Sequence, residues 1–132
     1  MNGIISGQAS TMVDHKNWLL GHFRDQDSGL QCQEIEIKVS AHSPGDKPHY
    51  PSGQIWSASR VAVSVVIMIS GRHRLIFPQQ EVELCRPLDF VVWPPGTFHH
   101  WLTLEPSQLL CIRGPSVPSE VVFTNEPTAD NS

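Results

Sequence analysis

The sequence lacks a long hydrophobic run, a basic cluster and an apolar leader. Its longest apolar stretch, residues 61–69, is too short to cross a bilayer and is interrupted by Ser64. A formal net charge of −4 without a run of Lys or Arg argues against nucleic acid as the main partner. The N-terminus has neither a basic start nor an apolar segment of signal-peptide length. We therefore expect a cytoplasmic protein with no membrane and no nucleic-acid partner.

Cysteine is also scarce. The chain has three, an odd number, and no two of them are spaced as CxxC. This usage favours free thiols in a reducing compartment over a disulfide framework. Cys85 and Cys111 lie in apolar segments, where we expect buried and unreactive thiols.

Proline is absent from the first 43 residues, and all eleven prolines divide the chain from residue 44 onward into short pieces. Because proline removes a ladder donor and restricts the residue before it, these pieces should be strands and turns rather than long helices. With 132 residues, 39% hydrophobic and 17% charged, the chain suits one globular domain. The expected fold class is all-β, a sandwich or barrel.

The clearest strand alternates charged and apolar residues over 34–39. Its period of two predicts that Ile35, Ile37 and Val39 face the core and that Glu34 and Glu36 face solvent. Gly71 is expected to end a central apolar strand. The expected strands are 34–39, 60–69, 74–77, 81–85, 89–93, 98–104, 109–113 and 121–123.

The two ends of the chain are less regular. Asp14 could cap a short helix, but an edge strand from Trp18 towards Phe23 is the favoured interpretation. We expect one domain over 1–124, with its core at about 30–113, and a flexible tail over 125–132.

The most informative motif is Trp93-Pro94-Pro95-Gly96-Thr97-Phe98-His99-His100-Trp101. Pro95-Gly96 suits the centre of a type II turn, since proline presets the first φ and glycine accepts the positive φ that follows. Alternation after the turn predicts that His99 and Trp101 share one face and that His100 faces away towards the surface. A histidine held by such a turn is well placed to reach into the mouth of a barrel.

These residues resemble the second motif of the cupins, G-x5-P-x-G-x2-H-x3-N. The P-x-G-x-x-H segment is complete, Leu88-Asp89 stands in place of Gly-Asp, and Thr103 replaces the final asparagine. The first cupin motif, G-x5-H-x-H-x3,4-E-x6-G, aligns through its last glycine with Gly71. The resemblance implies a cupin-like double-stranded β-helix, a jelly-roll barrel of two antiparallel sheets.

The resemblance also implies a metal site, most of whose ligands are replaced here. Ser57 and Ser59 occupy the H-x-H positions and Ser64 the glutamate position, so that only His99 is kept. Serine is a poor ligand for iron, zinc or manganese. An alternative alignment places His49 in the H-x-H, with 54–60 as an insertion. His49 and His99, with His42 as a third ligand, would then form a reduced site for a divalent metal.

Other side chains are candidates for the barrel mouth. Trp93 and Trp101 could line a pocket for a planar ligand or a sugar, although strand-end aromatics more often pack in the core, and Tyr50 could supply a hydroxyl there. Arg72, His73 and Arg74 follow a turn, where we expect solvation rather than an anion site. Asp89 is expected to close the turn before its strand.

Three functions remain open from the sequence. The first is a cupin-like protein that binds a small-molecule ligand in the barrel mouth through His99, Trp101, Trp93, His49 and Tyr50, without the full customary metal site. The second is a metal-dependent cupin enzyme, of dioxygenase or isomerase type, that uses His99, His49 and His42. The third is a structural protein that forms a homodimer through an outer sheet. A fold alone does not choose among them.

Overall fold

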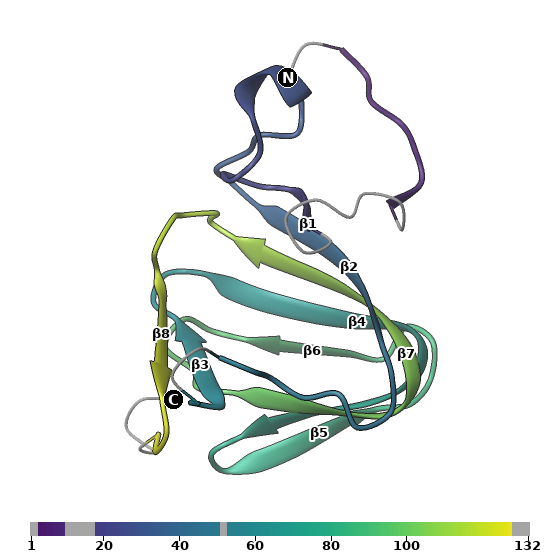
Figure 1. Ribbon diagram of the computed structural model, residues 1–132, viewed down its shortest axis with the longest axis vertical. Coiled ribbons are helices and arrows are strands. Elements are labelled where there is room, and N and C mark those ends of the chain that lie inside the picture. The colour runs from purple at the N-terminus through teal and green to yellow at the C-terminus, as the bar shows by residue number, and fades with distance from the viewer. Residues whose placement is uncertain (1–2, 10–17, 51–52, 128–132) are drawn as a thin grey trace.

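The structure is a computed structural model that describes residues 3–9, 18–50 and 53–127. Its described part is built almost entirely of antiparallel strands (Figure 1). A 3-10 helix, η3 (Gln26–Ser28), lies outside the sheets. None of the described residues belongs to a helix long and apolar enough to cross a membrane. The strands are β1 (Trp18–Leu20), β2 (Glu36–His42), β3 (Trp56–Ser59), β4 (Val63–Phe77), β5 (Gln80–Leu84), β6 (Phe90–Trp93), β7 (His100–Gly114) and β8 (Val121–Thr124).

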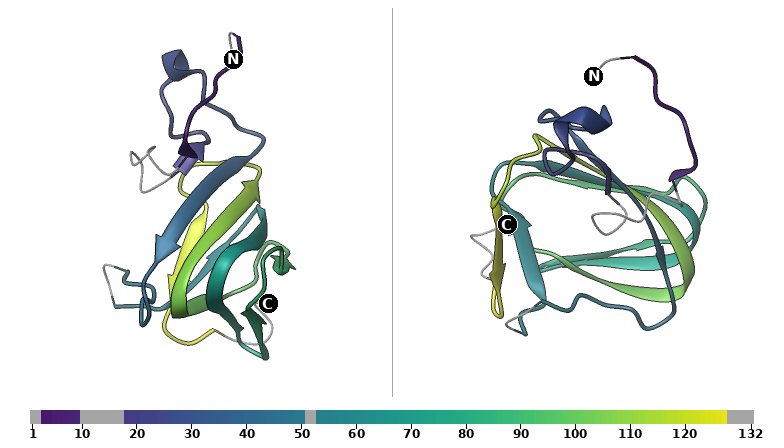
Figure 2. Two further views of the ribbon diagram at one scale, coloured as in Figure 1. Left: turned by 90° about the vertical axis from the view of Figure 1, so that its right-hand side faces the viewer. Right: turned by 45° about the horizontal axis from the view of Figure 1, so that its top comes forward.

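Two sheets enclose the interior. The larger has the order β1-β2-β7-β4-β5, with β6 paired to β4, and the smaller consists of β3 and β8. β4 and β7 have 15 residues each and pair along most of their length. Both curve strongly, so that the large sheet wraps round the interior while β3 and β8 stand across its open side (Figures 1 and 2). This arrangement is the double-stranded β-helix that the sequence predicts.

The predicted breaks in the two long strands are wrong. β4 passes through Gly71 without ending, and β7 passes through Pro106 between the two segments that we expected to be separate. The β4–β7 register shifts between Met68 and Arg72, so Gly71, with φ +103°, lies in a bulge that bends the strand. A glycine in a strand can mark a bulge as well as an end, and here it marks the bulge.

The predicted orientation of the 34–39 strand is also wrong. Glu36 and Ser40 are buried on the inner face of β2, while Ile35 is exposed and Ile37 and Val39 are only half-buried on the outer face. The alternation itself is correct, but period two does not say which face is the interior. Here the inner face is partly polar because it borders a cavity.

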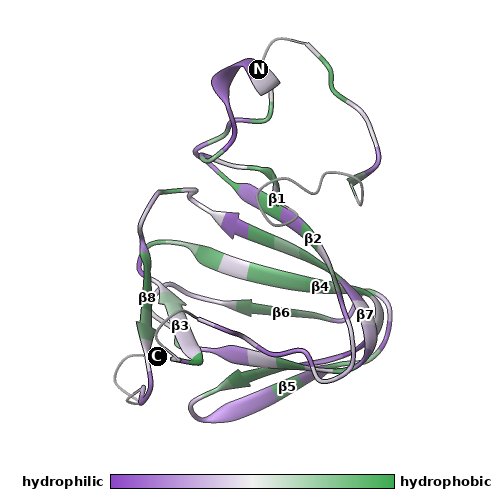
Figure 3. Ribbon diagram, viewed as in Figure 1, coloured by the Kyte–Doolittle hydropathy of each residue, from purple (hydrophilic) through white to green (hydrophobic). Residues whose placement is uncertain are grey.

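The outer face of the large sheet is apolar around β4 and β6, whose ribbons are coloured mainly as hydrophobic in Figure 3. Val63, Ile69, Phe90 and Val92 are exposed there. Pairing brings Ile37, Ile112, Val65 and Val92 into one row across β2, β7, β4 and β6, and Val39, Leu110, Ile67 and Phe90 into the next. Such a continuous apolar surface is unusual for a monomer.

The hydrophobic core lies on the inner side of β4, β5, β6 and β7. It consists of Val66, Met68, Leu75, Leu84, Val91, Trp93 and Leu109. Predicted strands 81–85, 89–93 and 121–123 match β5, β6 and β8 closely. β3 was not among the expected strands, yet it pairs with β8 over its whole length, so the alternative alignment that treated 54–60 as an insertion is wrong.

The ends of the described chain are short of regular structure. β1 pairs with β2 as an edge strand, as expected, but it ends at Leu20, and His22 and Phe23 form a turn instead of continuing the strand. The alternative helix cap, Asp14, lies outside the described residues. In the predicted tail, residues 125 and 126 form a bend, and 128–132 lie outside the described residues.

Candidate functional site

The predicted turn at Pro95-Gly96 is present, and Gly96 has φ +82°. The amide of Gly96 donates to the carbonyl of Ser59 at 2.7 Å. His99 and Ser57 exchange two backbone hydrogen bonds, at 2.9 and 3.1 Å. The motif is therefore fastened to β3, and this attachment fixes the backbone that carries His99.

The ring of His99 has a defined tautomer. Its Nδ1 lies 3.2 Å from the carbonyl oxygen of Thr97, which can only accept, so Nδ1 carries the proton and Nε2 keeps its lone pair. The ring packs against Trp93, with centroids 4.6 Å apart. Burial lowers the pKa of His99 to about 4, although the Thr97 contact opposes this shift. At neutral pH the side chain offers an uncharged acceptor.

His99 lines an interior cavity of about 470 Å³. This volume is within the range of small-molecule sites in proteins. Its aromatic wall is formed by Trp18, Tyr50, Trp93, Trp101 and Phe123. Its polar wall is formed by Lys38, Ser40, His42, Ser57, Ser64, His73, His99 and Arg113. Aromatic walls with a few directed polar groups are typical of ligand pockets.

The structure brings together five of the six residues singled out from the sequence. His99, Trp101, Trp93, Tyr50 and His42 all border the cavity. The hydroxyls of Tyr50 and Ser57 lie 3.2 Å apart, which joins the loop after β2 to β3. The sixth residue, His49, is exposed and contributes nothing to the cavity wall.

A histidine that the sequence placed in a solvated turn is instead buried at this cavity. His73 is 2% exposed, and its Nδ1 lies 3.0 Å from Oγ1 of Thr103. Its ring stacks on those of His42 and Trp101, at 5.6 and 5.3 Å between centroids. Burial, together with His42, lowers the pKa of His73 to about 4. The only sequence signal for this orientation is the glycine at position 71, since a glycine inside an apolar run can mark a bulge.

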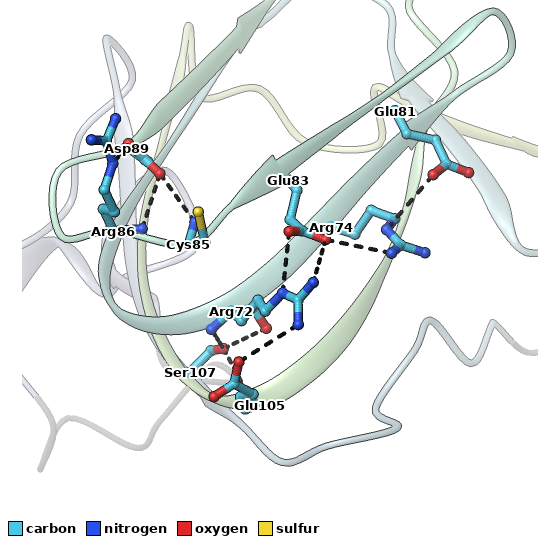
Figure 4. Close-up of polar contacts among 9 residues, drawn as sticks. All are labelled: Arg72, Arg74, Glu81, Glu83, Cys85, Arg86, Asp89, Glu105 and Ser107. Atoms are coloured by element: carbon cyan, nitrogen blue, oxygen red, sulfur yellow. Dashed lines mark hydrogen bonds and ion pairs between the residues drawn. The ribbon is translucent and has the colours of Figure 1, made fainter.

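The two arginines beside His73 point the other way. Arg72 pairs with Glu83 and Glu105, at 3.1 and 3.9 Å, and Arg74 with Glu81 and Glu83, at 3.6 and 3.4 Å (Figure 4). Exposed pairs of this kind contribute little to stability, but they neutralise both arginines. The anion site considered for Arg72, His73 and Arg74 is therefore absent from this part of the structure.

Four further expectations are settled by neighbouring contacts. Asp89 accepts hydrogen bonds from the amides of Cys85 and Arg86, at 3.0 and 2.9 Å, as expected for a residue that closes a turn. Cys85 is exposed rather than buried because β5 ends before it. Cys111 lies on the cavity wall, and burial raises the pKa of its thiol. His100 is half-buried against Trp56, at 4.5 Å between ring centroids.

The residues present do not fit the metal site that the cupin resemblance implies. Among the described residues, no three His, Cys, Asp or Glu side chains converge as a metal ion requires. The hydroxyl of Ser59 donates to Glu120, and that of Ser57 contacts Tyr50. With His49 exposed, the reduced set of His42, His49 and His99 is not assembled either.

Comparison with known proteins supports the fold. No family model and no curated protein matches the sequence. Among solved structures, the chain is similar to a sugar phosphate isomerase from a cupin superfamily of Silicibacter pomeroyi, with 18% identity, a TM-score of 0.55, and coverage of 82% of this chain and 80% of that one. The chain is also similar to a protein of Klebsiella pneumoniae with a double-stranded β-helix domain, with 14% identity, a TM-score of 0.57, and coverage of 71% of this chain and 77% of that one. The DMSP lyase DddQ of Ruegeria pomeroyi is similar as well, with 19% identity, a TM-score of 0.58, and coverage of 74% of this chain and 47% of that one. This protein therefore has the cupin fold.

Proposed function

We propose that this protein binds a small molecule in its interior cavity and does so without a resident metal ion. The observation that carries the proposal is the position of His99, held in one tautomer at the wall of an aromatic cavity. Its Nε2 can accept a hydrogen bond from a ligand hydroxyl or amide. The neighbours named as a lyase and an isomerase are compatible with a small-molecule site, but at 18–19% identity they do not identify a ligand.

Binding in the cavity can be tested with a neutral fluorescent probe, N-phenyl-1-naphthylamine. We expect its emission to rise on mixing with the protein and to saturate at one probe per chain. Ser64→Phe should abolish this rise, because Ser64 is buried at the cavity wall and the new ring would fill the space. Ser70→Phe is the matched control, since Ser70 lies on the same strand but is exposed.

Two outcomes of this experiment contradict the proposal. One is no rise in emission with the parent protein. The other is an equal rise with Ser64→Phe and with Ser40→Leu, which fills the cavity from β2. Chelation with EDTA should leave binding unchanged, and loss of binding after chelation would instead support the metal-dependent enzyme.

The apolar outer face supports a second proposal, a homodimer. A two-fold pairing of this face would cover Val63, Ile69, Phe90 and Val92 on both copies at once. We expect light scattering to give twice the mass of the chain, and Val92→Glu to give the monomer mass because a buried, unpaired charge is costly. A monomer at high concentration for the parent protein would contradict the dimer. The cytoplasmic location stays a prediction.

A further inference from the structure

Three of the residues that line the cavity are histidines, His42, His73 and His99. Burial lowers the pKa of all three, so their rings are uncharged at neutral pH. A neutral imidazole has one nitrogen that donates and one that accepts. The partner of one ring nitrogen therefore decides what the other nitrogen offers to a ligand.

His99 offers an acceptor. Its Nδ1 donates to the carbonyl oxygen of Thr97, which leaves the lone pair on Nε2. None of the residues that the structure describes donates to this Nε2. Only a ligand group that carries a proton, such as a hydroxyl or an N–H, complements it.

His73 offers a donor. Its Nδ1 lies 3.0 Å from Oγ1 of Thr103, and the two residues are 2% and 1% exposed. Within the described ranges, the Thr103 hydroxyl has no other hydrogen-bond partner. If Nδ1 of His73 carried the proton, the hydroxyl proton would be buried without an acceptor, which is costly. The hydroxyl therefore donates to Nδ1, and Nε2 of His73 carries the proton. This Nε2 has no partner among the described side chains either.

His42 offers neither group to a ligand. Its Nε2 lies 3.1 Å from Oγ of Ser40, a hydroxyl that is buried and has no other partner among the described residues. By the same reasoning Ser40 donates to Nε2, and Nδ1 carries the proton at 3.9 Å from Oδ2 of Asp46. Both nitrogens thus face protein groups. The ring of His42 stacks on that of His73 and helps to hold it in place.

The acceptor and the donor lie on either side of Trp101. In the pairing of β4 with β7, His73 is opposite Thr103, two residues beyond Trp101, whereas His99 is two residues before it. Four residues of extended chain span about 13 Å. Two hydrogen bonds of about 2.9 Å leave about 7 Å between the polar atoms of a ligand that joins the two rings. Polar groups at opposite ends of one aromatic ring have this separation.

We propose that the ligand is a planar compound with a hydroxyl or N–H donor at one end, bound by Nε2 of His99, and a carbonyl or ring-nitrogen acceptor at the other, bound by Nε2 of His73. A hydroxyaryl ketone is the simplest such compound. This inference rests on the proposed function, because it names the ligand class of the same cavity. An ether or a carboxylate at the His99 end would place one acceptor against another.

Calorimetric titration with four bicyclic compounds tests this hydrogen-bond pattern. 6-Hydroxy-1-tetralone has both groups, 1-tetralone lacks the hydroxyl, 6-methoxy-1-tetralone has it blocked, and 5,6,7,8-tetrahydro-2-naphthol lacks the carbonyl. We expect 6-hydroxy-1-tetralone to bind at least about fivefold more tightly than each of the other three, as for one net hydrogen bond.

Two variants assign each preference to its histidine. His99→Leu should remove the preference for hydroxyl over methoxy and keep the preference for the carbonyl. His73→Leu should do the reverse. Each variant is compared with itself across the four compounds, so a general loss of affinity does not imitate either result. His49→Leu is the control, since His49 is exposed and lies outside the cavity wall.

The two tautomers can be read in the parent protein without a ligand. Long-range proton–nitrogen correlation spectra at neutral pH distinguish a protonated Nδ1 from a protonated Nε2, and the two leucine variants assign the signals. We expect a protonated Nδ1 in His99 and a protonated Nε2 in His73. The opposite tautomer in either ring would overturn the pattern, even if a leucine variant fails to fold.

Three binding results would also overturn it: equal affinity for 6-hydroxy- and 6-methoxy-1-tetralone, a hydroxyl preference that survives His99→Leu, or a carbonyl preference that survives His73→Leu. Failure of the proposed function is separate. If 6-hydroxy-1-tetralone binds equally well to Ser64→Phe, the ligand lies outside the cavity. If the hydroxy and methoxy compounds bind equally and Ser64→Phe abolishes both, the cavity is kept and only the hydrogen-bond pattern is rejected.

Discussion

Lowering the pH from 6.5 to 4 should cost the folded state about 3 kcal/mol for each of His73 and His99. Burial lowers the pKa of each ring to about 4 from 6.5. The unfolded chain, whose histidines keep the ordinary pKa, then binds more protons than the folded one within this window. The stabilisation is therefore complete above pH 6.5, falls with pH through the window and falls no further below 4. Because whole domains are stable by only about 5–15 kcal/mol, the effect is large.

Denaturant unfolding at a series of pH values measures this loss. His73→Gln and His99→Gln should each remove their own part of the dependence between pH 6.5 and 4.5, a range above the ordinary pKa of carboxylates. His49→Gln is the control, because His49 is exposed. An unchanged dependence in both cavity variants would show that these histidines are not held neutral by burial.

Gly71→Ala should destabilise the protein by about 3 kcal/mol or more. Gly71 has φ +103°, and a Cβ at this position would overlap the carbonyl oxygen of Pro106 and lie 2.5 Å from the hydroxyl oxygen of Ser107. Backbone and a buried side chain must move to make room. The substitution therefore adds an overlap to the strain of the positive φ, at the point where β4 bends against β7.

Gly45→Ala separates these two costs. Gly45 has φ +87°, but nothing lies within 4 Å of a Cβ built there. Gly45→Ala should therefore lower the free energy of unfolding only through the strain of the positive φ, by about 1 kcal/mol. Equal losses of unfolding free energy in the two variants would mean that the close approach at Gly71 relaxes easily.

The part of the site that could be predicted from the sequence, around His99, depends on local turn preferences and strand alternation. Pro95-Gly96 specifies its own turn, and alternation after a fixed turn places both His99 and Trp101 on the cavity. β5, β6 and β8 were found for the same reason, since turn residues bound them, whereas Gly71 and Pro106 lie inside β4 and β7 and do not end them. These features predict the all-β class, and the resemblance of the motif around His99 to the cupins implied the cupin fold.

The part that was missed depends on contacts between distant segments. Glu36 was assigned to solvent because a carboxylate usually is, yet Arg113, 77 residues later, pairs with it in the interior. His73 was misplaced because its orientation is set by a bulge between β4 and β7, which no period within one strand reveals. Lys38 and Arg113 reach the same cavity wall only because β2 and β7 pair. Such contacts join segments that are far apart in the sequence, so local patterns in a single sequence do not predict them.

Competition between two unlike ligands tests most directly whether the interior cavity is the binding site. Increasing amounts of 6-hydroxy-1-tetralone should displace N-phenyl-1-naphthylamine from the parent protein, with the emission returning to that of free probe. Simultaneous binding of both compounds, with the probe emission unchanged at saturating hydroxytetralone, would contradict a single cavity that serves as the ligand site.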